Sequence, residues 1–175
     1  MITYETHVNP FAHEFARVKI PDDMIKKACV WVDAMVVAKA SETHWQKDHG
    51  HATKRILTGI MGEIATEIVL DQKFIDWSIG PNSAEYHNPD LAGIGSNIGV
   101  KTVEHGKFPL IFKVNYYPQI INIFRYKDKT CFVCGLATPE VLDEYQSDDL
   151  ILSPALKRRG TKSGFYGFEH LRRLK

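Results

Sequence analysis

Several features that would assign this sequence to a particular class of protein are scarce in it. Only three of its 175 residues are cysteine, so a complete disulfide framework cannot form. The first residues lack the basic and then apolar order of a secretory signal. No apolar run approaches the roughly 18 residues that a membrane-spanning helix needs. We therefore expect a cytoplasmic protein without a membrane segment.

The sequence also lacks a strong net charge. Its 22 Lys and Arg residues stand against 21 Asp and Glu residues, which leaves a formal net charge of +1. Any binding to nucleic acid would have to come from a local patch and not from the charge of the whole molecule. A hydrophobic content of 44% and a charged content of 25% are typical of a globular protein. We expect one domain over residues 1–175.

Two long helices are predicted in the first half of the chain. Residues 13–20 alternate well enough for an edge strand. Asp22 and Asp23 then supply an N-cap and first-turn acids for a helix that runs to about Trp45. Apolar residues at i, i+3 and i+4 spacing predict a second helix over about residues 52–71, whose apolar stripe faces a core.

Two glutamates lie one turn apart along the edge of that second apolar stripe. Glu63 and Glu67 share the helix with glycines at positions 59 and 62, each of which costs about 1 kcal/mol relative to alanine. Close packing or the close approach of a ligand would explain this cost. The two carboxylates therefore belong either to a site or to ordinary surface ion pairs.

The predicted site is organised around residues 86–104, which read YHNPDLAGIGSNIGVKTVE. If Gly95 and Ser96 are the central residues of a tight hairpin, the register sets Asp90 opposite Lys101 on one face of the sheet. A longer loop with a bulge would shift this register by one residue. On these residues alone, an ordinary cross-strand ion pair explains the pattern as well as a site does.

The order of these parts resembles that of the PD-(D/E)XK nuclease superfamily over roughly residues 54–137. A helix with Gly-Glu is followed by Pro-Asp, a turn and a strand with Val-Lys-Thr. The resemblance implies a restriction-endonuclease-like fold and a nuclease that cleaves DNA with Mg²⁺, for which Mn²⁺ substitutes. It assigns catalytic roles to Asp90, Lys101 and Glu63. Asp90, Glu63 and the carbonyl of Val100 would bind the metal, and Lys101 would contact the attacked phosphate or the nucleophilic water.

One position departs from the pattern of that superfamily. The second acid is expected two residues before the lysine, where this chain has Gly99. Either a carboxylate from elsewhere replaces the missing acid, or the site is weakened or inactive. The candidates for the replacement are Glu63, Glu67 and Glu104, and Glu67 is also a candidate metal ligand. In the second case the chain is a catalytically impaired nuclease-fold module that binds DNA or serves in an assembly.

Segments rich in β-branched and aromatic residues predict the remaining strands, which we expect to form a meander of at least four strands with the predicted hairpin. These segments are residues 110–117, 121–126 and 130–137. A proline-capped helix should begin near Thr138. The expected fold is α+β with α/β/α layers, a central mixed sheet of four or more strands preceded by two helices. Cys131 and Cys134 have CxxC spacing, but residues three apart in a strand point to opposite faces, so we interpret them as core cysteines.

The end of the sequence is basic and aromatic. Residues 157–175 contain seven Lys and Arg residues against one acid, with three aromatic residues between them. Basic side chains neutralise phosphates and aromatic rings stack on unpaired bases, although these rings could equally pack on the core. The candidate DNA contacts are Lys157, Arg158, Arg159, Lys162, Arg172 and Arg173.

Two further points concern partners. The resemblance leaves room for a homodimer, because small nucleases of this kind often need one to act on two strands. An interaction domain without a nucleic-acid role is the other alternative, and charge reversal at Arg158 and Arg159 would distinguish it by leaving DNA affinity unchanged.

Overall fold

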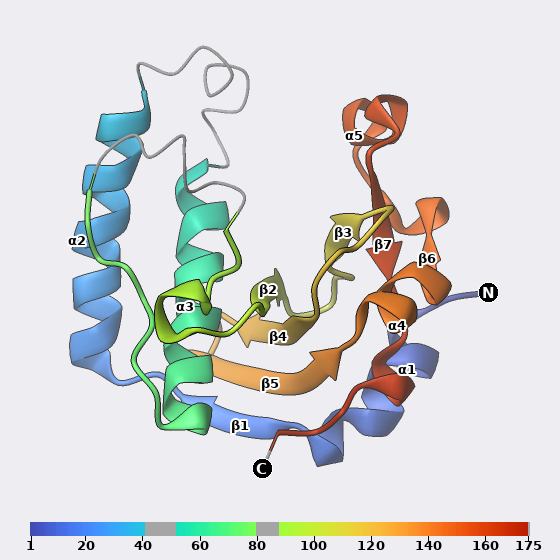
Figure 1. Cartoon of the computed structure of the whole chain (residues 1–175), viewed down its shortest axis with the longest axis horizontal. Helices are drawn as coiled ribbons and strands as arrows, with labels where there is room; N and C mark the ends of the chain where they lie inside the picture. Colours follow the sequence, from blue (N-terminus) through green and yellow to red (C-terminus); the bar gives the residue numbers. More distant parts are fainter. Residues whose placement is uncertain (41–51, 80–87, 175) are drawn as a thin grey trace.

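A computed structural model gives the arrangement of the chain and describes residues 1–40, 52–79 and 88–174 (Figure 1). Two long helices, α2 (Asp22–Lys39) and α3 (Ala52–Leu70), lie where the sequence predicts them. The predicted end of the first helix near Trp45 lies outside the described residues. In the part of the chain that the structure describes, no helix is long and apolar enough to cross a membrane.

Four strands form a mixed sheet in the order β1-β5-β4-β2. They are β1 (Ala16–Lys19), β2 (Gly99–Glu104), β4 (Gln119–Arg125) and β5 (Thr130–Ala137). Strand β5 pairs antiparallel with β1 and β4, whereas β2 runs parallel to β4. The predicted edge strand and the mixed four-stranded sheet are confirmed. The meander is wrong, because the chain leaves this sheet after β2 and returns to it in the same direction.

Between β2 and β4 the chain contributes to a second sheet. Strand β3 (Leu110–Phe112) pairs antiparallel with β7 (Lys162–Phe165), which also pairs with β6 (Gln146–Ser147). Helix α4 (Pro139–Glu144) begins as predicted, because the Thr138 side chain accepts a hydrogen bond from the Val141 N–H. The remaining helices are short: α1 (Tyr4–His7), η1 (Asn9–Glu14), η3 (Ala92–Ile94), η4 (Asp148–Leu150), α5 (Pro154–Arg159) and η5 (Phe168–His170).

Each face of the four-stranded sheet carries its own apolar core. Helices α2 and α3 cover one face, where Val32 and Ile64 belong to the same buried cluster as Ile120. The other face packs against the second sheet and the short helices, with Ile111 and Phe165 among the buried residues. Figure 1 shows α2 and α3 on one side of the molecule and β3, β7 and α5 on the other. The structure is therefore α+β, but a second sheet stands where the expected α/β/α layering has a layer of helices.

The two cysteines of β5 are core residues, as predicted. Cys131 belongs to the core beneath α2 and α3, and Cys134 belongs to the core on the opposite face. Both are free and buried, and burial raises the pKa of each thiol. The two thiols lie on opposite faces of the strand, so they cannot bind one metal ion together.

Candidate functional site

Asp90 lies in a turn before β2 and not in a strand. Residues Ala92–Ile94 form the short helix η3, and Gly95 follows it in the left-handed conformation with a φ of 78°. The Leu91 N–H donates to the Ile98 carbonyl at 3.0 Å, which closes the loop. The predicted two-stranded hairpin is therefore wrong. Glycine at a left-handed position ends a helical turn as readily as it forms a hairpin, so the local sequence suits both structures.

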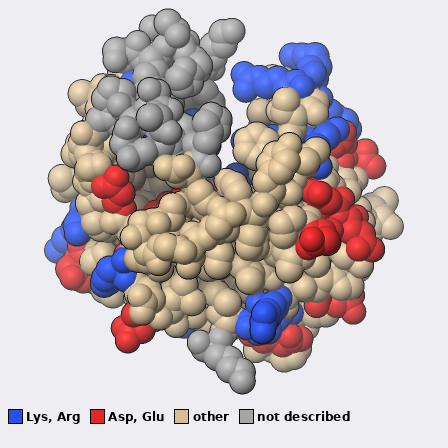
Figure 2. All heavy atoms as spheres, viewed as in Figure 1, with Lys and Arg blue, Asp and Glu red and all other residues tan. Residues whose placement is uncertain are grey.

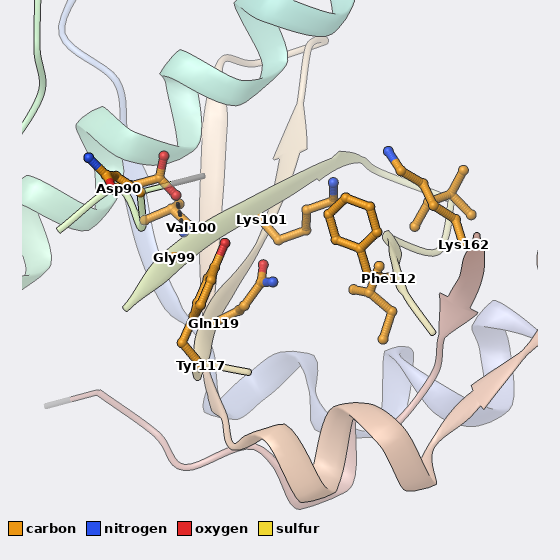
Figure 3. A pocket seen from close by; sticks show the side chains of 11 residues that line it. Asp90, Gly99, Val100, Lys101, Phe112, Tyr117, Gln119 and Lys162 are labelled. Carbon is orange, nitrogen blue, oxygen red and sulfur yellow. Dashed lines mark hydrogen bonds between the residues drawn. The ribbon is translucent and has the colours of Figure 1, made fainter. Parts of the chain in front are cut away.

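The turn still places Asp90 against β2. Its Oδ2 atom accepts a hydrogen bond from the Val100 N–H at 2.5 Å (Figure 3). Strand β2 is at the edge of its sheet, and the Gly99 N–H points inward, to the Pro118 carbonyl. Because backbone groups of successive residues alternate in direction, the N–H and the carbonyl of Val100 both face the outer edge. Asp90 and the Val100 carbonyl thus share that edge.

Glu63 on α3 lies within electrostatic reach of Asp90. Burial raises the pKa of Glu63 to about 8, and the negative charges of Asp90 and Glu67 add to this shift. Burial also raises the pKa of Asp90, against the opposing effects of the Val100 hydrogen bond and the Lys101 charge. Two carboxylates that repel each other favour a cation between them.

A glycine allows α3 to approach β2 this closely. A Cβ atom at Gly62 would lie 1.7 Å from Thr102 Oγ1, so any side chain there would collide with the strand. The Asn122 amide of β4 donates to the Gly62 carbonyl at 3.0 Å and to Thr66 Oγ1 at 2.9 Å, which fixes the helix on the sheet. Thr102 therefore faces the helix. The cost of Gly62 in a helix is thus explained by close packing, and the contact sets Glu63 beside β2.

The other two candidate acids already hold parts of the fold. Glu67 is 4% exposed, and its oxygens accept from the Phe74 and Ile75 N–H groups and from Lys73. Burial raises the pKa of Glu67, but these hydrogen bonds outweigh it and the net shift is downward. Glu104 binds Lys54 and Lys107, each at 2.8 Å. Of the three candidates, Glu63 alone makes no ion pair with another residue of the described ranges. A metal-binding role for Glu67 stays a prediction.

Lys101 lies on the face of β2 that is turned away from α3. Its side chain enters an open pocket of about 180 Å³ between the two sheets (Figure 3). Asp90, Lys162 and Phe112 also line this pocket. Burial, and after it the Lys162 charge, lower the pKa of Lys101 to about 8, while Asp90 opposes the shift. The predicted pair of Asp90 and Lys101 therefore shares one pocket, although no hairpin joins them.

Two lining residues were missed by reasoning from the sequence. A Cβ atom at Gly99 would lie 3.0 Å from Tyr117 Cε2 and 3.6 Å from both Gln119 Cδ and Asp90 Oδ2. Gln119 is the register partner of Gly99 in the parallel ladder. The side chains of Tyr117 and Gln119 therefore flank Gly99, the position where the superfamily has its second acid. No local pattern indicates this, because it follows from parallel pairing between strands that are not consecutive.

The basic C-terminal segment divides into parts with different roles. Lys157, Arg158 and Arg159 are exposed on α5, and Figure 2 shows basic side chains gathered at that tip of the molecule. Lys157 makes one ion pair, with Asp149 at 3.7 Å. Lys162 lines the pocket. Two of the three aromatic rings of the segment pack in the core, since Phe165 and Phe168 are fully buried, whereas Tyr166 is half-buried.

The end of the same segment serves the fold and lies away from α5 (Figure 1). Arg173 pairs with Glu14 at 2.8 Å and donates to the carbonyls of Cys134 and Phe168, each at 3.1 Å. Arg172 has an exposed side chain, and its backbone pairs with that of Leu136. The six predicted DNA contacts therefore do not form one continuous patch.

The oxygen ligands at the β2 edge suit Mg²⁺. Within residues 1–40, 52–79 and 88–174, no group of three or more His, Cys, Asp or Glu side chains is placed to hold a metal ion. Mg²⁺ is commonly bound by one or two carboxylates together with waters and phosphate oxygens. Asp90, Glu63 and the Val100 carbonyl supply such a set.

Comparison of the chain with protein-family models, with curated proteins and with solved structures found no match. A functional proposal for this chain rests on the geometry of its site.

Proposed function

We propose that the chain is a Mg²⁺-dependent deoxyribonuclease with a restriction-endonuclease-like core. The supporting observation is that Asp90 shares the outer edge of β2 with the Val100 carbonyl, lies within electrostatic reach of Glu63 on α3, and lines one pocket with Lys101. Asp90 is bound to the Val100 N–H, Glu63 responds to the charge of Asp90, and Lys101 shares the pocket of Asp90. A metal held by such oxygen atoms with a lysine nearby is one way to catalyse hydrolysis of a phosphodiester.

The carboxylates and the carbonyl would bind the metal. Asp90 is held in place by the Val100 hydrogen bond, and Gly62, which packs directly on β2, keeps the neighbouring Glu63 within electrostatic reach of Asp90. When bound there, Mg²⁺ lowers the pKa of a coordinated water and offsets charge on the attacked phosphate. The protein residues keep this arrangement fixed before substrate arrives, which is how preorganised charges contribute to catalysis.

Lys101 has the properties of a group that handles protons near neutral pH. With a pKa of about 8, its Nζ atom is neutral in a small fraction of molecules at pH 7 and can then accept a proton from the attacking water. In its charged form it neutralises the attacked phosphate as a compact point charge. Lys162 adds a second positive charge to the same pocket, and Arg158 and Arg159 would contact phosphates farther along the DNA.

The test is cleavage of a panel of linear, nicked, branched and single-stranded DNA with Mg²⁺, Mn²⁺ or EDTA. Asp90→Asn removes the charge and keeps an acceptor for the Val100 N–H, and Lys101→Met keeps the length of the side chain. Each should lower metal-dependent cleavage by at least about 100-fold. Asp33→Asn, on the exposed face of α2, is the matched control and should cleave as the wild type does. Undiminished cleavage by either site variant contradicts the assignment.

A second candidate function is a nuclease-fold module that binds DNA without cutting it. The specific observation in its favour is that Tyr117 and Gln119 flank Gly99 so closely that no acid side chain fits there without movement. This candidate predicts DNA binding that weakens with rising salt and no cleavage under either metal. The same panel distinguishes the two candidates.

A further inference from the structure

One wall of the pocket presents an exposed aromatic ring beside two lysines. Phe112, the last residue of β3, is 56% exposed although it lines the pocket. Its register partner is Lys162 of β7, whose Nζ atom lies 5.4 Å from the centre of the ring. Lys101 enters the same pocket from β2, and Figure 3 shows the Phe112 ring between the two lysine side chains in that view.

The backbone on both sides of this ring is held in place. Asn115 is 9% exposed and donates to the Phe112 carbonyl and to Asp143 Oδ1, each at 2.8 Å. Lys113 pairs with Asp148 at 2.6 Å, and Asp148 also accepts from Ser163 of β7 at 2.8 Å. The exposure of Phe112 is therefore built into the sheet. Because the backbone that carries the ring is already held, only the side-chain torsions of Phe112 are left to become ordered when a ligand stacks on it.

The charge around the ring favours an anion. Neither Lys101 nor Lys162 has a carboxylate within ion-pairing distance among the residues that the structure describes. The charges of Arg55 and Arg159 act on Lys162, and those of Lys162 and Arg55 act on Lys101. At Lys101 the charge of Asp90 opposes them. Lysines gathered in a pocket without matching acids are suited to phosphate.

We infer that this wall binds an unpaired nucleotide, with its base stacked on Phe112 and its phosphate held by Lys101 and Lys162. An isolated exposed hydrophobic residue needs no explanation, but an aromatic ring that shares a pocket with two lysines, neither of them ion-paired within the described residues, matches both parts of a nucleotide. A base inside a duplex is covered on both faces by its neighbours. The substrate class is therefore single-stranded DNA, such as a flap or a frayed end. The inference rests on the proposed function in taking DNA as the ligand.

The test is binding of a fluorescein-labelled single strand and of its duplex to the whole chain in EDTA, followed by fluorescence anisotropy. The wild type should bind the single strand more tightly. Phe112→Leu keeps an apolar side chain without an aromatic face and should weaken single-strand binding about 5- to 150-fold, with duplex binding unchanged. Phe112→Tyr should restore it. Tyr116→Leu is the matched control, since Tyr116 is 85% exposed in the same segment and does not line the pocket.

Three results would overturn the inference. They are equal affinity of the wild type for duplex and single strand, equal loss in Phe112→Leu and Tyr116→Leu, and competition by an abasic strand as strong as that by a normal strand. Because no cleavage takes place in EDTA, these outcomes are separate from the proposed nuclease activity. Cleavage that is lost in the Asp90 variant but unchanged in Phe112→Leu would contradict the single-strand site and leave the nuclease proposal intact. Single-strand binding that is weakened in Phe112→Leu, together with no cleavage under either metal, would contradict the nuclease proposal and leave the single-strand site intact.

Discussion

The two glycines of α3 should respond to alanine substitution in opposite directions. A Cβ atom at Gly59 would meet no atom within 4 Å, whereas one at Gly62 would lie 1.7 Å from Thr102 Oγ1 and 2.7 Å from Thr102 Cβ. Both substitutions gain the same helix propensity, about 1 kcal/mol. They differ only in what the new methyl group meets, so each is the control for the other.

The magnitudes follow from that difference. Gly59→Ala should raise the free energy of unfolding by about 1 kcal/mol, which raises the Tm by about 2–4 °C for a chain of this size. In Gly62→Ala, rotation of the Thr102 side chain can move Oγ1 away but leaves Cβ in place, so the helix or the strand itself must shift. Overpacking of this kind costs about 1–3 kcal/mol. Because the Asn122 hydrogen bonds oppose the shift, we expect the upper part of that range and a net loss of about 1–2 kcal/mol.

Urea unfolding followed by circular dichroism measures both changes. A Gly62→Ala protein as stable as the wild type would refute the close contact between α3 and β2. A double variant adds an independent check, since Thr102→Gly removes the atoms that the new methyl group meets. In that background the cost of Gly62→Ala should shrink, which appears as a coupling energy between the two positions.

Two further predictions concern side chains whose roles the structure separates. Glu67→Gln should lower stability by about 1–3 kcal/mol at pH 7, because the buried carboxylate accepts two backbone N–H groups and Lys73. The folded state lowers the pKa of Glu67 from its ordinary 4.5, so the contribution of the charge is present above that pH and is lost as the pH falls through the lowered pKa. Urea unfolding of both proteins across this range should show their difference shrinking with acid, and a constant difference would contradict the account. Arg173→Met should lower the Tm, whereas the double variant Arg158→Glu, Arg159→Glu should keep the Tm of the wild type and bind DNA more weakly. Thermal melting and fluorescence anisotropy measure the two effects. The reverse pattern would contradict the roles given to these arginines.

Local signals predicted much of the fold. The 3.6-residue period placed α3 within one residue, and Thr138 followed by proline placed the start of α4. The alternation of residues 13–20 predicted the edge strand β1. Each of these signals lies within the element it predicts, so no knowledge of distant contacts was needed.

The pairing of the strands could not be predicted in the same way. Consecutive strands usually lie next to each other, which is why a meander was expected after β2. Here β3 instead pairs with β7, about fifty residues away in the chain, and β2 pairs with β4 in parallel. The composition of β3 does not indicate which of the two sheets it joins.

The candidate site was predicted in its acids and its lysine but not in its surroundings. Asp90, Glu63 and Lys101 follow from the order of short motifs along the chain, and that order survives the loss of the hairpin. Arg158 and Arg173 show the limit of composition, because both belong to one basic segment although one is exposed and the other is bound into the fold. Only burial and partners distinguish them.

The two glycines that border the site explain together why its acids come from different elements. Gly62 has no side chain, so α3 lies directly on β2 and brings Glu63 toward Asp90. Gly99 has none either, and Tyr117 lies so close that a carboxylate could not be returned to that strand position without displacing the ring. A side chain at Gly99 would thus crowd the Tyr117 ring, while Glu63 on the helix lies within electrostatic reach of Asp90. In the proposed nuclease Glu63 would take the role of the second acid that the resemblance expects at Gly99, and the cleavage panel decides between this rearranged site and a module that only binds DNA.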